Sequence, residues 1–227
     1  MKQLDLEPIV RQAFSKRRKA INAYIGANRE KYIAFATMLT PSETDEKAIL
    51  SRVAFAVLSA NASLEDAIKA LGYCLERYAQ VENVESDVLR TYHMIGAKAD
   101  WVNRLWYRTN FEDLLRQGDS WNDYRLRLRH VKGLGLTKAS FAACLLYPLE
   151  ADLACVDTWM QKVFLGNPSF KTLKLVNYRR VESQIRRIAR TFRVSTFLAQ
   201  WMIWDHARRR GPSNHAIFPG SHKGELP

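Results

Sequence analysis

Residues 130–139 read HVKGLGLTKA, which places a Gly-x-Gly turn, Gly133 to Gly135, between two segments with helical spacing of apolar residues. Glycine accepts a left-handed backbone and lets another group come close to the main chain. A helix that begins directly after the turn presents unpaired N–H groups and the positive end of its dipole there, which suits a phosphate. Lys132 and Lys138 flank the turn. The pattern predicts a phosphate-binding hairpin, although Gly-x-Gly on its own is also typical of ordinary helix–helix turns.

An aspartate follows one helix later, after a loop that contains Pro148. Residues 154–163 read ACVDTWMQKV, and Asp157 stands at the start of a further helical pattern. An aspartate directly before a residue such as Thr158 is usually the N-cap of the next helix. These residues alone therefore leave two interpretations of Asp157 open, a structural cap and a functional carboxylate.

Four segments of the chain, in this order, resemble the helix-hairpin-helix DNA glycosylases, the superfamily of endonuclease III, adenine glycosylase and 8-oxoguanine glycosylase. Residues 56–62 (AVLSANA) are similar to the family's LLSAQT, and residues 95–102 (IGAKADWV) to its GxxxxKAxxI with a shorter loop. Residues 130–139 and 154–163 are similar to its LPGVGxKTA hairpin and its VDTH segment, with matching spacing. Four blocks in the right order, within residues 48–165, are much more specific than any single motif.

The resemblance implies an all-α, two-lobed fold that holds double-stranded DNA across its cleft and a flipped base in a pocket between the lobes. An enzyme that works on a base atom or a glycosidic bond has to extrude the base from the stack. We expect residues 45–135 to form the hairpin-side lobe and residues 1–44 with residues 136–210 to form the second lobe. Residues 211–227 are expected to be an extended tail.

Apolar spacing predicts helices nearly throughout, beginning with a basic segment over residues 10–31. A polar break at residues 40–43 follows, where we expect Ser42 to be an N-cap. Ser63, three residues before Asp66, gives a second cap signal. Further helices are predicted over residues 48–60, 63–79, 83–92, 98–107, 121–130, 137–147, 158–164, 171–191 and 195–210.

The composition favours a polyanionic partner. The 227 residues include 35 Lys and Arg against 23 Asp and Glu, a formal net charge of +12. Neutralised phosphates release counterions, so nucleic acid is the first expectation and an anionic membrane surface the second. Neither a membrane-spanning apolar run nor a signal peptide is evident, and we expect an intracellular monomer without a membrane partner. Cys74, Cys144 and Cys155 lack a C-x-x-C pair, which predicts buried thiols rather than disulfides or metal ligands.

By the resemblance, Asp157 is the catalytic carboxylate, which stabilises positive charge developing on the deoxyribose and orients a water. The bifunctional glycosylases place a Schiff-base lysine where this chain has Thr137. Lys138 comes one residue later, and one residue turns a side chain by about 100° around a helix. We therefore expect Lys138 to face phosphates or solvent, while Thr137 and Lys138 both stay candidates for the pocket. Trp159 replaces the family's histidine and is a further pocket candidate.

Other candidate residues each carry two interpretations. Asn61 aligns with a glutamine that fills the gap left by the flipped base in relatives, or it is a helix cap. Met94 and Ile95 stand where relatives carry an apolar wedge, or they belong to the core. Asp205 and His206 either read the base edge or form a solvated helix end. We expect four tryptophans either to form a stacking wall for the base or to belong to the core, namely Trp101, Trp106, Trp201 and Trp204.

Three functions fit this sequence. The first is a monofunctional N-glycosylase that removes a modified base, and the second is a transferase that places an amine or amino acid on a 5-substituted thymine, as associated with viral relatives of the fold. The third is a non-catalytic DNA-binding module. No cofactor or metal site is expected, apart from a monovalent cation at the hairpin. The predicted DNA contacts are Asn61, Lys132, Gly133, Gly135, Thr137 and Lys138.

Overall fold

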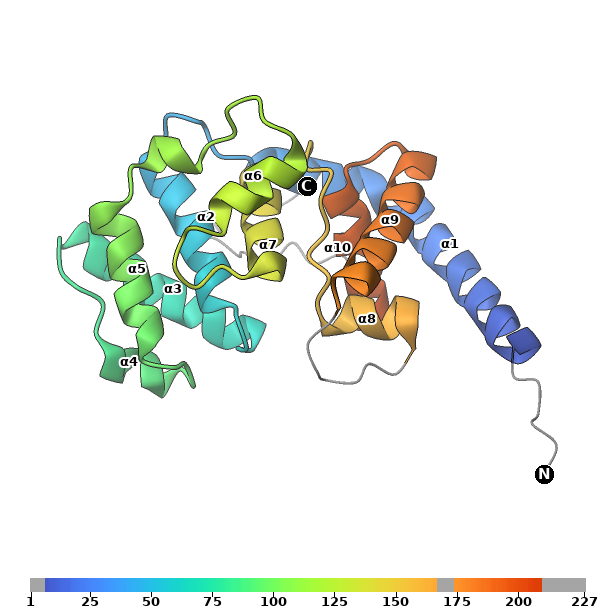
Figure 1. Ribbon diagram of the computed structural model, residues 1–227, viewed down its shortest axis with the longest axis horizontal. Coiled ribbons are helices and arrows are strands. Elements are labelled where there is room, and N and C mark those ends of the chain that lie inside the picture. Colours follow the sequence, from blue (N-terminus) through green and yellow to red (C-terminus); the bar gives the residue numbers. More distant parts are fainter. Residues whose placement is uncertain (1–6, 167–173, 210–227) are drawn as a thin grey trace.

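The computed structural model describes residues 7–166 and 174–209, with side chains from residue 17 onward (Figure 1). Within these ranges all regular structure is helical and no strand is present, as the sequence predicts. The predicted tail, residues 211–227, lies outside the described residues. The elements are α1 (Glu7–Leu39), α2 (Glu46–Leu58), α3 (Leu64–Ala79), α4 (Ser86–Thr91), α5 (Ala97–Arg108), the 3₁₀ helix η1 (Phe111–Leu114), α6 (Trp121–Leu128), α7 (Leu136–Leu146), α8 (Thr158–Leu165), α9 (Leu175–Phe192) and α10 (Thr196–Ala207).

The helices gather in two groups that lie side by side in Figure 1, α2 to α7 in one and α1 with α8 to α10 in the other. In the first group α2 is central, because it contacts α3, α5 and α7 and every residue from Ile49 to Leu58 is buried. Helix α7 packs on α2 and on α6. These contacts place α7 with the helices of residues 45–135, not with those of residues 136–210 as expected, since the apolar α7 covers one side of α2.

Helix α10 is the centre of the second group and contacts α1, α8 and α9. Its buried residues include an unbroken run from Thr196 to Ile203, as expected for a helix enclosed by neighbours. Helix α1 contributes Ile21, Ile25, Tyr32 and Ala36, all buried. Their spacings of four, seven and four residues put them on one face of the helix. The first helix of the chain thus packs against its last helices.

Two helix starts test the predicted caps. The Ser63 hydroxyl accepts the Asp66 N–H at 3.0 Å and donates to the Asp66 carboxylate at 2.7 Å, so Ser63 is confirmed as the N-cap of α3. Ser42 is not the N-cap of α2. That cap is Asp45, whose carboxylate accepts the Ala48 N–H at 2.9 Å. The polar break first forms a turn in which the Asp45 N–H donates to the Ser42 carbonyl at 3.0 Å. Helix α2 therefore begins only at Glu46.

The predicted buried thiols are confirmed, because Cys74, Cys144 and Cys155 are all buried and unpaired. Burial raises the pKa of Cys74 and of Cys155 to about 12, so both thiols stay protonated at neutral pH and are poor nucleophiles. In the part of the chain that the structure describes, no group of His, Cys, Asp and Glu is arranged to hold a metal ion. No helix there has both the length and the apolar character to cross a membrane.

Candidate active site

The predicted hairpin joins α6 to α7, and its two glycines differ in backbone conformation and in the space around them. Gly133 has a φ of 92°, and a Cβ there would lie 2.5 Å from Cε3 of Trp101. Gly135 has an extended backbone, with φ −74° and ψ 178°, and open space where a Cβ would be. Only Gly133 therefore requires glycine, a distinction that the Gly-x-Gly pattern does not reveal. Lys132 is exposed beside the turn and stays a predicted phosphate contact.

We expect Gly133→Ala to lower the free energy of unfolding by about 2–4 kcal/mol, because it combines left-handed strain with overlap against the Trp101 ring. Gly135→Ala should cost less than about 1 kcal/mol, since only a weak N-cap changes. Urea denaturation of the two variants beside the wild type measures both effects. Equal losses for the two glycines would contradict this assignment of roles within the turn.

Asp157 is the N-cap of α8 and also turns a second oxygen toward α10. One carboxylate oxygen accepts the Met160 N–H at 2.8 Å, and the other accepts the indole N–H of Trp204 at 3.1 Å. Burial raises the pKa of Asp157, while the Met160 N–H, the charge of Lys138 and the Trp204 N–H oppose that rise. A cap needs only one oxygen, so the two interpretations of Asp157 are compatible.

Lys138 points inward, toward the same site. Its ammonium donates to the Ser59 hydroxyl at 2.8 Å and lies 5.2 Å from the centroid of the Phe141 ring. Burial lowers the pKa of Lys138, and nearby groups that include the Asp157 carboxylate act in the opposite direction. The ammonium is therefore held by the protein and does not extend freely into solvent, while a contact of Lys138 with a phosphate stays a prediction.

The reason that Lys138 points inward lies in how α7 packs on α2. The first residue of α7, Leu136, follows the turn directly, and this packing directs residue 138 toward the end of α2. Thr137, which takes the lysine position of the family, is half-buried. The angular offset between positions 137 and 138 is as expected, but the sequence does not show which of the two faces inward.

A buried lysine, Lys98, holds the end of α2 beside Lys138. The Lys98 ammonium donates to the Leu58 carbonyl at 2.7 Å and to the Ala60 carbonyl at 2.6 Å. Burial, together with the charge of Lys138, lowers the pKa of Lys98 to about 8. Since Ser59 lies between the two carbonyls, Lys98 fixes the residue that holds Lys138.

Buried side chains from both helix groups hold the extended segment that leads to Asp157. Glu182 of α9 accepts the Ala154 N–H at 3.1 Å and pairs with Arg125 of α6 at 2.9 Å. Tyr178 of α9 donates to the Ala154 carbonyl at 2.6 Å. Charges that are this deeply buried are tolerated only when they are paired and hydrogen-bonded. The ion pair therefore ties α6 to α9 and fixes the segment between them.

Two further contacts complete this support. The Tyr178 hydroxyl shares a hydrogen bond of 2.9 Å with Ser140 of α7, two residues after Lys138. Gln200 of α10 accepts the Cys155 N–H at 2.6 Å and donates to the Cys155 carbonyl at 2.9 Å. The helix that carries Lys138 and the segment that carries Asp157 are thus held in register by hydrogen bonds.

Helix α10 meets the site through Trp204, one of the predicted stacking residues, and not through Asp205 or His206. Asp205 is buried and accepts a hydrogen bond from Tyr32 of α1 at 2.5 Å. It is therefore neither a solvated helix end nor accessible to a base, because α1 covers that side of α10. His206 is half-buried, with its ring 5.1 Å from that of Tyr24. Trp204 is the residue of α10 that reaches Asp157.

The tryptophans separate into core and site. Trp106 and Trp201 are buried in the core, and Trp101 packs against the hairpin turn. Trp204 is half-buried, with the Arg208 guanidinium 4.1 Å from its ring centroid. Of the four predicted stacking residues, Trp204 alone lies beside Asp157.

The remaining candidates lie in the α2 to α7 group. Met94 belongs to the core, whereas Ile95 is 61% exposed, a large value for an isoleucine. Asn61 is exposed in the turn after α2, with a φ of 52°. It is not the cap of α3, because Ser63 has that role. Ile95 as a wedge and Asn61 as a gap filler stay predictions.

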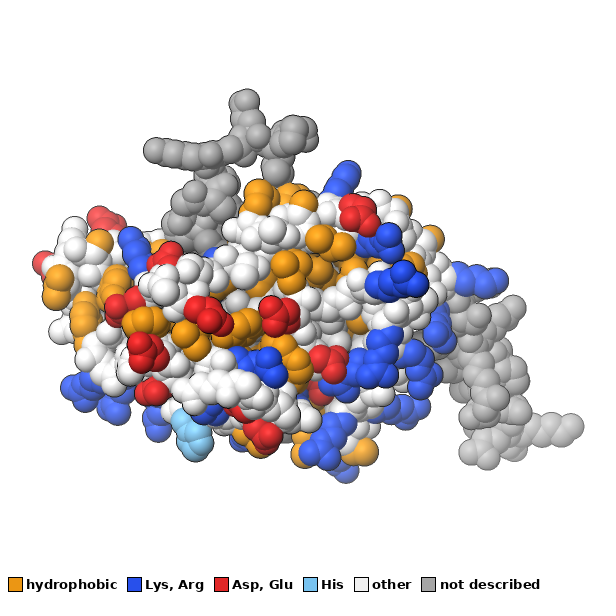
Figure 2. Space-filling view, turned by 90° about the horizontal axis from the view of Figure 1, so that it is seen from above, with side chains coloured by type: hydrophobic (Ala, Val, Ile, Leu, Met, Phe, Trp, Pro, Cys, Tyr) orange, Lys and Arg blue, Asp and Glu red, His pale blue; other side chains and the backbone are white. Residues whose placement is uncertain are grey.

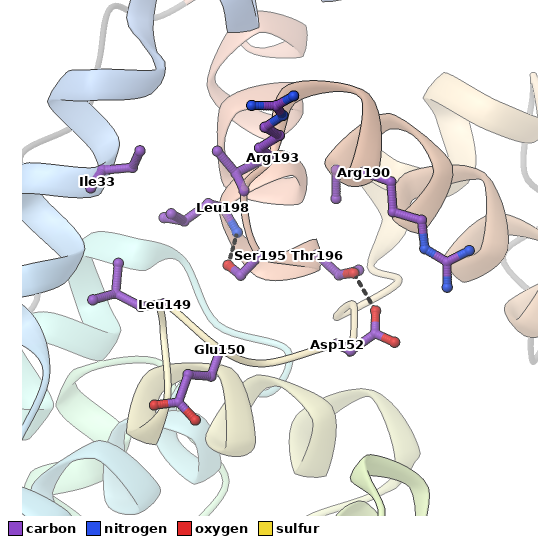
Figure 3. A pocket seen from close by; sticks show the side chains of 11 residues that line it. Ile33, Leu149, Glu150, Asp152, Arg190, Arg193, Ser195, Thr196 and Leu198 are labelled. Carbon is purple, nitrogen blue, oxygen red and sulfur yellow. Dashed lines mark hydrogen bonds between the residues drawn. The ribbon is translucent and has the colours of Figure 1, made fainter.

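A hollow of about 460 Å³ lies away from this site, between α1, the end of α9 and the start of α10 (Figure 3). Glu150 and Asp152 line it together with Arg190 and Arg193. Thr196 donates to Asp152 at 2.6 Å across its floor. Its charges are of both signs, and it contains none of the candidate catalytic residues.

Positive charge is unevenly distributed over the surface. On the face seen in Figure 2, Lys and Arg gather over the half that holds α1 and α9, while most Asp and Glu lie over the other half. Helix α9 exposes Arg179, Arg180, Arg187 and Arg190, whereas its single acidic residue, Glu182, is buried. A polyanion would therefore be attracted chiefly to the half formed by α1 and α8 to α10.

The fold resembles that of solved 8-oxoguanine DNA glycosylases. It is similar to the 8-oxoguanine DNA glycosylase of Thermotoga maritima, with a TM-score of 0.64, 19% identity, and coverage of 85% of this chain and 96% of that one. It is also similar to the 8-oxoguanine glycosylase/lyase of Methanocaldococcus jannaschii in complex with a 15mer DNA containing 8-oxoguanine, with a TM-score of 0.68, 18% identity, and coverage of 85% and 97%. No family model and no curated protein matches the sequence.

Sequence reasoning missed several residues of the site. Ser59, directly after α2, and Phe141, within α7, contact Lys138, but both stand in apolar segments that read as core. Glu182 carries no motif, and the role of Gln200 depends on the fold of the segment before Asp157. Ser59 alone has a signal, because it lies within the AVLSANA segment that resembles the family.

Proposed function

We propose that the protein is a DNA base-processing enzyme that flips a modified base and hydrolyses its N-glycosidic bond. The observation that carries this proposal is that Asp157, at the start of α8, and the inward ammonium of Lys138 beside the hairpin are close enough for each charge to shift the pKa of the other. The glycosylase fold and the net charge of +12 support it. Double-stranded DNA is the proposed substrate, and the hairpin its proposed phosphate contact.

In the proposed reaction the bond between C1′ and the base nitrogen breaks, and its electron pair leaves with the base. Positive charge develops on the sugar, and the Asp157 carboxylate stabilises it where little water screens the interaction. The same carboxylate can orient the water that attacks C1′, and the proton that this water loses passes to the departing base, which leaves an abasic site. Phe141 and Trp204, half-buried residues on the two helix groups, provide aromatic surfaces for the extruded base.

A second candidate is excision by the amine of Lys138, followed by cleavage of the strand. Its specific support is the burial of Lys138, since a desolvated lysine with a lowered pKa is a better nucleophile. The first candidate is preferred because Thr137 occupies the position of the family's Schiff-base lysine and the Asp157 charge favours the protonated form of Lys138. In the described residues, nothing favours the transferase alternative.

Mass spectrometry of duplexes after incubation tests the proposal. A panel with 8-oxoguanine first, followed by other modified bases, should yield an abasic strand in which a hydroxyl from water replaces one base and no other group is added. Borohydride present during the reaction should trap little protein on the DNA, because hydrolysis forms no Schiff base.

Lys138→Ala and Lys132→Ala serve as a matched pair of lysine variants. Abundant trapping with the wild type and with Lys132→Ala, abolished by Lys138→Ala, would replace hydrolysis with the amine mechanism. Strands that gain mass would point to the transferase instead.

A further inference from the structure

Two neighbouring hollows share Arg17 of α1 in their lining. The larger, of about 400 Å³, lies between α1, α8 and α10, and the smaller, of about 110 Å³, lies between α1, α8 and α9. Arg17, Ile21 and Val163 line both. The Arg17 guanidinium donates to the Lys162 and Val163 carbonyls at 3.3 Å and 3.1 Å, at the end of α8. We call this feature the Arg17 groove.

The rim of the Arg17 groove is basic. Besides Arg17 it carries Arg18 and Arg187 around the smaller hollow and Lys162 and Arg209 around the larger one. Among the described residues, neither hollow has an aspartate or glutamate in its lining, in contrast to the mixed hollow of Figure 3. Of the charged groups that the structure describes, none forms an ion pair with Arg18, Lys162, Arg187 or Arg209. These four cations are exposed and available to an anion.

The floor of the groove is apolar, and one end is aromatic. Ile21 and Val163 are buried below the rim. Trp159, half-buried, lines the larger hollow, with the Lys162 amine 4.8 Å from its ring centroid. Cations beside an apolar floor and an aromatic face are the combination that holds a single nucleic-acid strand, whose phosphates follow the charges while its bases stack. A paired helix keeps its bases stacked inside and offers none to such a floor.

The position of the groove connects it with the candidate active site. Trp159 is two residues after Asp157, and α8 leads from Asp157 toward α1 (Figure 1). We infer that the Arg17 groove binds single-stranded DNA, with its phosphates on Arg18, Lys162 and Arg187 and a base against Trp159. This site is separate from the hairpin contact of the proposed function and does not depend on base removal.

Binding of a labelled oligothymidylate of about ten nucleotides, followed by fluorescence anisotropy on the full chain, tests the inference. The double variant Arg18→Ala with Arg187→Ala should bind it about tenfold more weakly. Its plot of log affinity against log salt should be less steep by about 1.4, the share of two phosphates on a single strand. Trp159→Ala should also weaken binding about tenfold, through lost stacking.

The matched control is Lys47→Ala with Arg108→Ala, two exposed cations of the other helix group, which removes the same charge. It should change the affinity less than about twofold and leave the salt slope unchanged. Equal weakening by both double variants would overturn the inference, because net charge alone would then explain binding. If the wild type bound inorganic pyrophosphate but no oligothymidylate, and the Arg18→Ala with Arg187→Ala variant bound neither, this result would overturn the inference and show a small-anion site. Since only binding is measured, a failed strand test leaves base removal open, and an inactive enzyme leaves the strand test valid.

Discussion

Asp157→Asn should lower single-turnover base release by about 100-fold or more, with the fold and DNA binding retained. Asparagine keeps the size of the side chain and an oxygen for the Met160 N–H of α8, but it carries no charge to oppose the charge on the sugar. The rate is measured on the duplex that the product assay identifies, and a gel shift and a thermal melt check binding and folding. Near-normal turnover in this variant would remove Asp157 from the chemistry.

The pH dependence of the wild type gives an independent check on Asp157. Burial raises its pKa, so turnover should fall with decreasing pH at a value above that of an ordinary aspartate, because the protonated carboxyl is neutral. Trp204→Phe keeps an aromatic ring and removes a hydrogen bond that opposes the rise. The acid limb of this variant should therefore move to higher pH. An acid limb that stays in place would show that Trp204 does not act on Asp157.

Glu182→Ala should lower the free energy of unfolding by about 3–5 kcal/mol, because it leaves the buried charge of Arg125 without a partner. The Ala154 N–H also loses its acceptor. Urea denaturation measures the loss, and the matched control is Glu65→Ala, which breaks the exposed pair with Lys69.

The control should cost less than about 1 kcal/mol, as exposed pairs do. Replacing both Arg125 and Glu182 by methionine should recover part of the loss, since no unpaired charge remains. A Glu182→Ala variant as stable as the Glu65→Ala variant would mean that the pair does not hold α6 and α9 together.

Much of the fold could be predicted from local sequence. The Gly-x-Gly turn, the Asp157 segment and the spacing of apolar residues give the hairpin and most helices. Where prediction failed, a tertiary contact decided the outcome. Asp45 and not Ser42 is the N-cap of α2, because a turn lies between Ser42 and the helix. Asp205 is buried because α1 packs against its side of α10.

Less of the candidate site could be predicted, for a geometric reason. An offset of one residue between Thr137 and Lys138 fixes their relative angle, but not the orientation of α7 on α2. Ser59, on the turn after α2, selects Lys138 by a hydrogen bond. Which of the two residues faces inward is decided by the packing of α7 on α2, and the spacing of residues within either helix does not show it.

The position of α1 also has a consequence for the order in which the chain acquires its structure. Ile21, Ile25 and Tyr32 leave the ribosome well before α9 and α10, yet these two helices pack against α1. The contacts within the α2 to α7 group are nearer in sequence than those between α1 and α10, so we expect this group to form before α1 is covered. Throughout synthesis the apolar stripe of α1 therefore stays open to the solvent or to a chaperone, and nascent chains that stall before residue 196 are the species most exposed to aggregation.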